Sequence, residues 1–142
     1  MTSVSSHTEL YVAVQQFYAR QMQKLDRREL EAYADTFTED GVFGHARGEQ
    51  PSRTRAGILS FLKEFHKRFE TDPMQRRHHF NMIDLRSQDD GSIATSFYAM
   101  VFVTRPGRQT ELGASCTVED CLVWQDGELL TRSRLIELDK DR

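Results

Sequence analysis

The sequence predicts an α+β domain in which helices come first and a curved antiparallel sheet follows. Two observations support this fold class. Apolar residues recur at helical spacing through the first half of the chain. From Arg76 onward, apolar segments are separated by turn sequences, namely Asp89-Asp90-Gly91-Ser92, Arg105-Pro106-Gly107 and Gln125-Asp126-Gly127. Helices and strands segregated in this way favour a sheet with helices packed on one face.

Two helices are predicted at the start of the chain. The first spans about residues 8–24, and the apolar residues on its inner face are Leu10, Val14, Phe17, Tyr18 and Met22. The second is predicted to begin at Asp26, which forms a capping-box arrangement with Glu29 three residues later. Its apolar face consists of Leu30, Tyr33, Ala34 and Phe37, so we expect this helix to end near Thr38.

A turn, a short strand and a third helix are predicted next. Glu39-Asp40-Gly41 has the composition of a turn, residues 41–46 form a short strand, and a polar loop continues through Pro51. Asp72-Pro73 ends the third helix, because a residue before proline is disfavoured in the helical conformation. The apolar face of this helix comprises Ile58, Leu59, Leu62, Phe65, His66 and Phe69.

The C-terminal half is predicted to form a four-strand antiparallel meander. Residues 93–104 are apolar at both alternating sets of positions, which is typical of a strand covered on both faces. One face would contact the helices and the other a second subunit. We therefore predict a homodimer formed through the outer face of the sheet.

Length and composition limit the classes of protein to consider. The 142 residues suit one domain at 8–142, preceded by a flexible N-terminus at 1–7. A net charge of −3, from 19 basic and 22 acidic residues, gives no general reason to bind nucleic acid or an anionic membrane.

No apolar segment approaches the roughly 20 residues of a membrane span, and the first residues lack signal-peptide features. We expect a cytoplasmic protein with no membrane partner, whose Cys116 and Cys121 are free thiols.

Several motifs are absent from the sequence. It contains no glycine-rich phosphate loop, no nucleophile elbow and no Cys-x-x-Cys pair. His-Glu-x-x-His and facial-triad spacings are absent as well. These absences disfavour nucleotide, α/β-hydrolase and metal chemistry, so we predict neither a cofactor nor a metal.

Asp120 stands out because it shares a strand face with apolar residues. Side chains alternate along a strand, so the even positions from 112 to 124 point to one side. These positions hold Leu112, Ala114, Cys116, Val118, Asp120, Leu122 and Trp124. A carboxylate in an apolar interior is costly unless it is paired, hydrogen-bonded or protonated. Either Asp120 does chemistry, or a bulge turns it outward, or Arg132 or Arg134 pairs with it in a structural ion pair.

Histidines and tyrosines supply further candidates. His78 and His79 are adjacent on a predicted strand, so only one of them can share the cavity of Asp120, and alternation alone does not choose between them. A histidine there would be a general acid or base, or else a structural residue. His45 is a secondary candidate on the first strand. The hydroxyl groups of Tyr18, Tyr33 and Tyr98 could hold a carbonyl or enolate oxygen, although such tyrosines are more often core residues.

Three short motifs stand out along the chain: Phe37-Thr38-Glu39-Asp40-Gly41-Val42-Phe43, Arg77-His78-His79-Phe80-Asn81, and Val118-Glu119-Asp120-Cys121-Leu122-Val123 followed by Asp126-Gly127. Together with the order of the elements, they resemble the NTF2-like superfamily, in particular its SnoaL-like branch of polyketide cyclases and dehydratases. The resemblance covers about residues 8–140. It implies a cone-shaped fold whose helices and curved sheet enclose a pocket.

Within this resemblance, the second motif is similar to the segment that carries a catalytic histidine in scytalone dehydratase, and the match falls on His79. Asp120 is similar in position to the base of SnoaL-type cyclases and to an Asn of the dehydratase. His45 stands where the dehydratase has a tyrosine on its first strand. Met22 and Tyr98 stand near its helix tyrosine and its second histidine, and these differences count against scytalone as the substrate.

The residues and the resemblance together predict a small cofactor-independent lyase or cyclase in natural-product biosynthesis. It would act on a hydroxylated keto-aromatic or polyketide intermediate by removing a proton next to a carbonyl. His79 and Asp120 would be the acid and base, with Tyr98, Tyr33 and His45 as further polar groups. The substrate-binding candidates are Tyr18, Tyr33, Phe17, Phe37, Met100, Phe102, Trp124 and Arg134.

Two alternatives remain. The chain could be a non-catalytic ligand-binding protein or a small subunit of the aromatic-ring dioxygenase type. It could also hydrolyse an epoxide. That reaction would require an Asp-Arg-Asp set around a water molecule, and Asp120 with Arg132 or Arg134 supplies only part of this set. One fold hosts many chemistries, so the fold does not choose among these functions.

Overall fold

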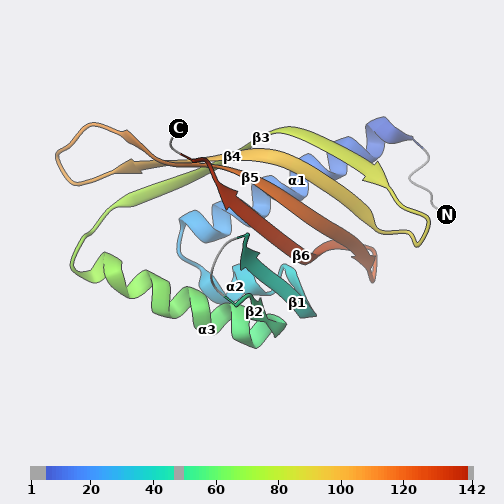
Figure 1. Cartoon of the computed structure of the whole chain (residues 1–142), viewed down its shortest axis with the longest axis horizontal. Coiled ribbons are helices and arrows are strands. Elements are labelled where there is room, and N and C mark those ends of the chain that lie inside the picture. Colours follow the sequence, from blue (N-terminus) through green and yellow to red (C-terminus); the bar gives the residue numbers. More distant parts are fainter. Residues whose placement is uncertain (1–5, 47–49, 141–142) are drawn as a thin grey trace.

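A computed structural model describes residues 6–46 and 50–140 (Figure 1). The helices are α1 (His7–Asp26), α2 (Leu30–Ala34) and α3 (Thr54–His66), and the 3₁₀ turn η1 (Lys67–Glu70) extends α3. The strands are β1 (Phe37–His45), β2 (Ser52–Arg53), β3 (Gln75–Ser87), β4 (Ile93–Thr104), β5 (Glu111–Gln125) and β6 (Glu128–Leu138). The predicted α+β class, with helices before the meander, is confirmed.

The six strands form one curved, open sheet in the order β2-β1-β6-β5-β4-β3. The meander from β3 to β6 is antiparallel throughout, as predicted. The prediction of a wholly antiparallel sheet is wrong, because β1 pairs in parallel with β6 and places Phe43 opposite Arg134. The first and last long strands are therefore neighbours, which brings residues from both ends of the chain to one place.

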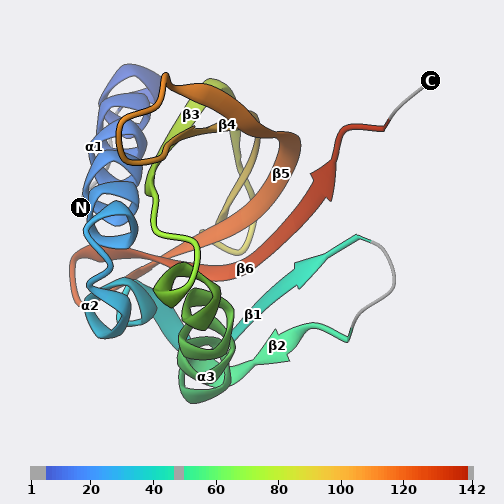
Figure 2. The ribbon, with the colours of Figure 1, turned by 90° about the vertical axis from the view of Figure 1, so that its left-hand side faces the viewer.

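The helices cover the concave side of the sheet (Figure 2). α1 packs against β3, and α3 packs against β1. The short helix α2 contacts both α1 and α3. Two groups of buried residues result. The first lies under α1 and includes Val14, Phe97 and Leu122, and the second lies between α2, α3 and β1 and includes Phe37 and Ile58.

The predicted second helix is wrong in extent. Asp26 ends α1 and does not cap a new helix, and α2 has five residues, beginning at Leu30. The chain turns sharply at Arg28, whose φ of 63° lies in the left-handed region. Phe37 belongs to β1, where it pairs with Thr131. Pairing with β6 therefore prevails over the helical spacing of the apolar residues, and the turn predicted at residues 39–41 lies inside β1.

The remaining boundaries agree closely with the sequence. Ser6 caps α1 by accepting a hydrogen bond from the backbone N–H of Glu9 at 3.0 Å. Asp126 and Gly127 join β5 to β6 with φ angles of 53° and 81°, as a tight two-residue hairpin requires.

Of the predicted flexible N-terminus at 1–7 and the loop at 46–51, residues 1–5 and 47–49 lie outside the described part of the chain. Within the described residues no helix is long and apolar enough to cross a membrane.

Candidate functional site

Asp120 points inward, as alternation predicts, and forms an ion pair with Arg134. The two residues are directly opposite on β5 and β6. The guanidinium donates from Nε to Oδ1 at 2.9 Å and from Nη2 to Oδ2 at 2.8 Å, and both side chains are almost fully buried. Tyr18 donates to Oδ2 at 2.7 Å and also contacts Thr95. The structural ion pair is therefore the alternative that the structure favours.

Arg134 extends this network toward the helices. It donates from Nη1 to the Tyr33 hydroxyl at 3.0 Å and from Nη2 to the Gln21 carbonyl at 2.7 Å. The amide of Gln21 in turn binds Thr36 and Thr131. Although burial opposes the charge, Asp120 raises the pKa of Arg134 above its usual range. Burial, and next the Asp120 charge, raise the pKa of Tyr18 well above its usual value, so the phenol stays neutral.

A cavity of about 150 Å³ lies between the end of α1, α3 and the concave side of β3–β6. Most of its wall is apolar, including Phe43, Phe61 and Phe80. Its polar lining residues are Tyr33, His45, His66, Arg76, His78 and Arg134. Asp120 is absent from the described lining, so this carboxylate supports Arg134 and does not itself face the cavity.

His78, and not His79, faces this cavity. Its Nδ1 lies 2.6 Å from an oxygen of Asp26, and its backbone N–H also donates to that carboxylate. A carboxylate only accepts, so Nδ1 carries the proton and Nε2 of the neutral ring is an acceptor to which no residue in 6–46 or 50–140 donates. Burial lowers the pKa of His78, while the hydrogen bond and charge of Asp26 oppose that shift. The ring is therefore a neutral base held in one tautomer.

His79 is exposed and stacks edge-on against Phe102 at 5.1 Å on the outer side of the sheet. The expectation that His79 shares a cavity with Asp120 is wrong, because adjacent strand residues point to opposite faces. Tyr98, Met100 and Phe102 lie on the same outer side, with Tyr98 57% exposed. These three residues are therefore not in the described lining of the cavity beside His78, and their expected contact with a substrate stays a prediction.

Two further histidines lie at the cavity. His66 contacts the backbone carbonyl of Leu62 through Nδ1 at 2.9 Å, which leaves Nε2 as the acceptor of its neutral ring. Burial lowers the pKa of His66. His45 is an exposed lining residue at the end of β1, as expected of a residue near the opening.

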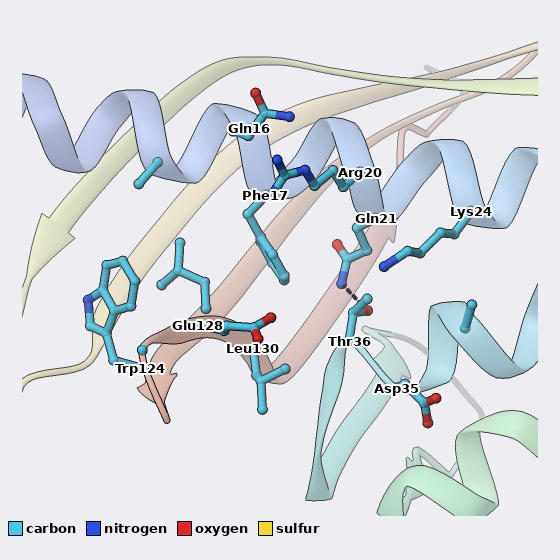
Figure 3. Close-up of a pocket in the computed structure, with 14 residues that line it drawn as sticks. Gln16, Phe17, Arg20, Gln21, Lys24, Asp35, Thr36, Trp124, Glu128 and Leu130 are labelled. Atoms are coloured by element: carbon cyan, nitrogen blue, oxygen red, sulfur yellow. Dashed lines mark hydrogen bonds between the residues drawn. The ribbon is translucent and has the colours of Figure 1, made fainter.

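The other predicted binding residues divide between the network and a second hollow. Phe37 is fully buried, with its ring 5.6 Å from the Arg134 guanidinium carbon, and Tyr18 is bound to Asp120. Figure 3 shows Phe17 extending from α1 toward Leu130, with Trp124 beside them. These three residues line a groove of about 490 Å³, whose described lining includes neither Asp120 nor His78. Neither Trp124 nor Asp120 is in the described lining of the cavity beside His78, so the expectation that they share a cavity is wrong. Trp124 lies at the end of β5 and lines the groove beside α1.

Sequence reasoning missed two lining residues of the cavity, His66 and Arg76, and it missed Asp26, which binds His78 from outside the described lining. Local patterns assign Asp26 to a helix cap and His66 to an apolar helix face. Arg76 lies two residues before His78 and therefore on the same strand face, so alternation could have identified it once His78 was chosen. No local pattern indicates that Asp26 reaches His78, because that contact joins residues 52 positions apart.

Comparison with known proteins identifies the family. Residues 6–134 match the model of the SnoaL-like domain, and the chain belongs to this family. The fold resemblance inferred from the sequence is thereby confirmed. A comparison with curated proteins found no match.

Several solved structures are similar along the whole chain. ActVI-ORFA from Streptomyces coelicolor is 45% identical, with a TM-score of 0.85 over 92% of this chain and 97% of that chain. A protein from Catenulispora acidiphila, solved in complex with S-DNPA, is 46% identical, with a TM-score of 0.84 over 94% and 96%. Aln2 from a Streptomyces species is 36% identical, with a TM-score of 0.86 over 96% and 95%.

A more distant structure shares the fold alone. The β subunit of benzoate 1,2-dioxygenase from Burkholderia mallei is 14% identical, with a TM-score of 0.79 over 98% of this chain and 93% of that chain. Its similarity carries no information about activity, because one fold supports unrelated functions.

Proposed function

We propose that this protein is a small cofactor-independent dehydratase or cyclase of natural-product biosynthesis. It acts on a hydroxylated keto-aromatic or polyketide intermediate by moving a proton next to a carbonyl. The observation that carries this proposal is the His78–Asp26 pair, with its 2.6 Å contact, at the wall of an otherwise mainly apolar cavity. Family membership and the relative solved with S-DNPA support a small-molecule substrate.

In this proposal His78 replaces His79 and Asp120 as the proton-transfer group. Nε2 takes the proton from the carbon next to the substrate carbonyl, and Asp26 stabilises the resulting imidazolium. In a dehydration the hydroxyl on the following carbon leaves, taking that proton from Nε2 as water, which restores the neutral ring. In a cyclisation the carbanion closes a ring on a second carbonyl, whose oxygen receives the proton.

Arg134 and Tyr33 would hold the carbonyl oxygen. Arginine has five N–H donors, and the described residues accept from four of those on Arg134. One N–H on Nη1 is left without an acceptor among these residues. The Tyr33 hydroxyl accepts from Arg134 and donates to no other described side chain. Both residues line the cavity, and two such donors would stabilise the negative charge that develops on an enolate oxygen.

The test compares variants on a panel of planar hydroxyketones, with product release followed by absorbance. His78→Asn should lower kcat/KM by about 10²–10⁴-fold because it removes the base. His79→Asn changes the neighbouring exposed residue and is the matched control, with activity expected to stay near that of the wild type. Equal activity in wild type and a folded His78→Asn variant would overturn the proposed role of His78.

The non-catalytic alternative rests on one specific observation. Asp120, the most conspicuous carboxylate of the sequence, is fully occupied by Arg134 and Tyr18, as expected of a structural network. A protein of this kind would hold a ligand without turnover or associate with a larger subunit. Co-purification with such a subunit, together with no turnover of any ketone in the panel, would favour this alternative.

The homodimer and the cytoplasmic location remain predictions. Apolar side chains on the outer side of the sheet support the homodimer, because Tyr98 is 57% and Leu135 47% exposed, and Phe102 is half-buried on the same side. A second copy that covers this surface would remove these side chains from water.

A further inference from the structure

Arg76 is the charged residue of the cavity that the proposed chemistry does not use. It lies on β3, is half-buried, and lines the cavity two residues before His78. Among residues 6–46 and 50–140 its guanidinium forms neither a hydrogen bond nor an ion pair. Its contacts are with the rings of Phe65 and Phe69, at 5.5 Å and 5.4 Å from their centres. No buried side-chain nitrogen of the described residues lacks a partner, so the donors of Arg76 are accessible from the cavity and can take an acceptor from a ligand.

The surroundings of Arg76 do not supply that acceptor. The negative charge of Asp26 favours the charged form of Arg76, but the Asp26 carboxylate is hydrogen-bonded to His78. Arg28 and Arg68 add positive charge nearby. The described lining residues of the cavity include no Asp or Glu. Arg134 is neutralised by Asp120 behind the wall, whereas no ion pair among the described residues neutralises Arg76. The cavity wall therefore holds one guanidinium, on β3 beside Phe65 of α3, that has no ion-pair partner among the described residues.

We propose that Arg76 binds a carboxylate of the ligand, so that the cavity accepts a planar aromatic or polyketide acid in preference to its neutral counterpart. The planar guanidinium can donate two parallel N–H groups to one carboxylate, and the rings of Phe65 and Phe69 limit its orientations. This inference rests on the proposed function and refines it by naming the class of substrate.

The dimensions of the site agree with such a ligand. A cavity of about 150 Å³ in another protein accepts benzene, so one aromatic ring fits the inner part of this cavity. The wall continues through Phe61, Phe65 and His45 into an outer hollow, which offers room for a second ring. Residues two apart on a strand are separated by about 7 Å, so the carboxylate would lie within a few bonds of the carbon that faces His78.

Isothermal titration calorimetry with naphthylacetic acid and its neutral amide, naphthylacetamide, tests this proposal. At about pH 8 the ordinary pKa of histidine is exceeded, so Arg76 and Arg134 are the cations left in the wall. The wild type should bind the acid about tenfold more tightly than the amide, as expected for a charged hydrogen bond. Arg76→Gln should abolish that preference by weakening binding of the acid while leaving the amide unchanged.

Arg77→Gln is the matched control, because it removes the same charge from the next residue, which is exposed on the opposite side of β3. It should keep the preference for the acid. An equal loss in both variants would mean that a general field, and not a contact, is responsible, and would overturn the proposal. Equal affinity of the wild type for acid and amide, or saturable binding of neither, would overturn it as well.

Two further measurements separate this result from folding and from catalysis. Circular dichroism checks each variant, and if Arg76→Gln does not fold, Arg76→Lys takes its place. Lysine keeps the charge without the planar fork, so an intermediate loss of preference is expected. His78→Asn should retain the preference for the acid even where turnover is lost. Failure of the proposed catalysis and failure of carboxylate binding therefore give different results.

Discussion

Asp120 and Arg134 lie directly opposite each other on β5 and β6, and the guanidinium binds both oxygens of the carboxylate. Neither side chain is more than 1% exposed. Arg134 lines the cavity, Asp120 lies behind it, and the charge of the pair is compensated within the fold. This geometry changes the interpretation of the residue that looks most catalytic in the sequence.

Asp120→Asn should destabilise the fold. The substitution keeps the shape of the side chain but leaves the Arg134 charge buried without its counter-ion, which costs about 3–5 kcal/mol in comparable pairs. Urea denaturation measures the free energy of unfolding. Glu119→Gln removes a charge from the adjacent exposed residue and should change stability by less than about 0.5 kcal/mol. A variant Asp120→Asn of wild-type stability that has lost all turnover would instead make Asp120 catalytic.

The acidic limb of the pH profile should lie below about pH 6.5, the ordinary pKa of histidine. The neutral form of His78 is the base, and burial lowers its pKa, so the ring becomes protonated only at lower pH. Activity is then lost as the pH falls through this lowered pKa. The nearby groups that act on this ring are Asp26, which raises its pKa, and Arg76 and Arg134, which lower it.

Asp26→Asn should shift this limb to still lower pH, because it removes the hydrogen-bonded charge that favours the imidazolium. A kcat/KM profile of wild type and variant checks the direction. In the unfolded chain His78 takes up its proton at about pH 6.5, which is above its pKa in the folded protein. Protonation therefore favours unfolding, and the free energy of unfolding falls as the pH drops from about 6.5 toward the lowered pKa. Circular dichroism at each pH separates the two effects. A limb that moves toward neutral pH in Asp26→Asn would contradict the assignment.

Trp124 should be insensitive to ligands bound beside His78. It is the single tryptophan of the chain and lines the groove with Phe17, away from the cavity. A ligand seen by calorimetry should therefore leave its fluorescence nearly unchanged, whereas Phe61→Trp would place a reporter in the cavity wall. Strong quenching of Trp124 that survives His78→Asn and vanishes in Phe17→Ala would locate the binding site in the groove instead.

A homodimer should appear by light scattering at about 33 kDa, twice the 16.5 kDa of one chain. Tyr98→Asp places a charge on the outer side of the sheet and should shift the mass toward the monomer. Val12→Asp introduces the same charge at a 62% exposed position of α1 and should leave the mass unchanged. A mass of one chain for the wild type would rule out the predicted dimer.

The sequence predicted the sheet better than it predicted the site. Alternation correctly oriented Asp120, and turn residues such as Asp126 and Gly127 correctly separated the strands, because both signals are local. The same reasoning failed for Phe37, whose helical spacing was overridden by pairing with a strand more than ninety positions away. It also left His78 and His79 undecided, since the choice depends on which face of β3 the helices cover.

The site itself depends on contacts between distant parts of the chain. Asp26 meets His78 across 52 positions, and Tyr33 meets Arg134 across 101. Such contacts follow from how α1 and α2 pack on the curved sheet that contains β3 and β6, and no spacing rule encodes them. The type of chemistry could be anticipated from the residues present, whereas the particular base could not.

The parallel pairing of β1 with β6 has a consequence for biosynthesis on the ribosome. Domains are made from the N-terminus onward, so β1 leaves the ribosome long before the strand that completes its hydrogen bonds. Until β6 emerges, one edge of β1 stays unpaired and the Asp120 carboxylate has no counter-ion. A nascent chain that stalls before β6 therefore has neither a finished sheet nor a cavity floor, and it should be a preferred client of chaperones and proteases.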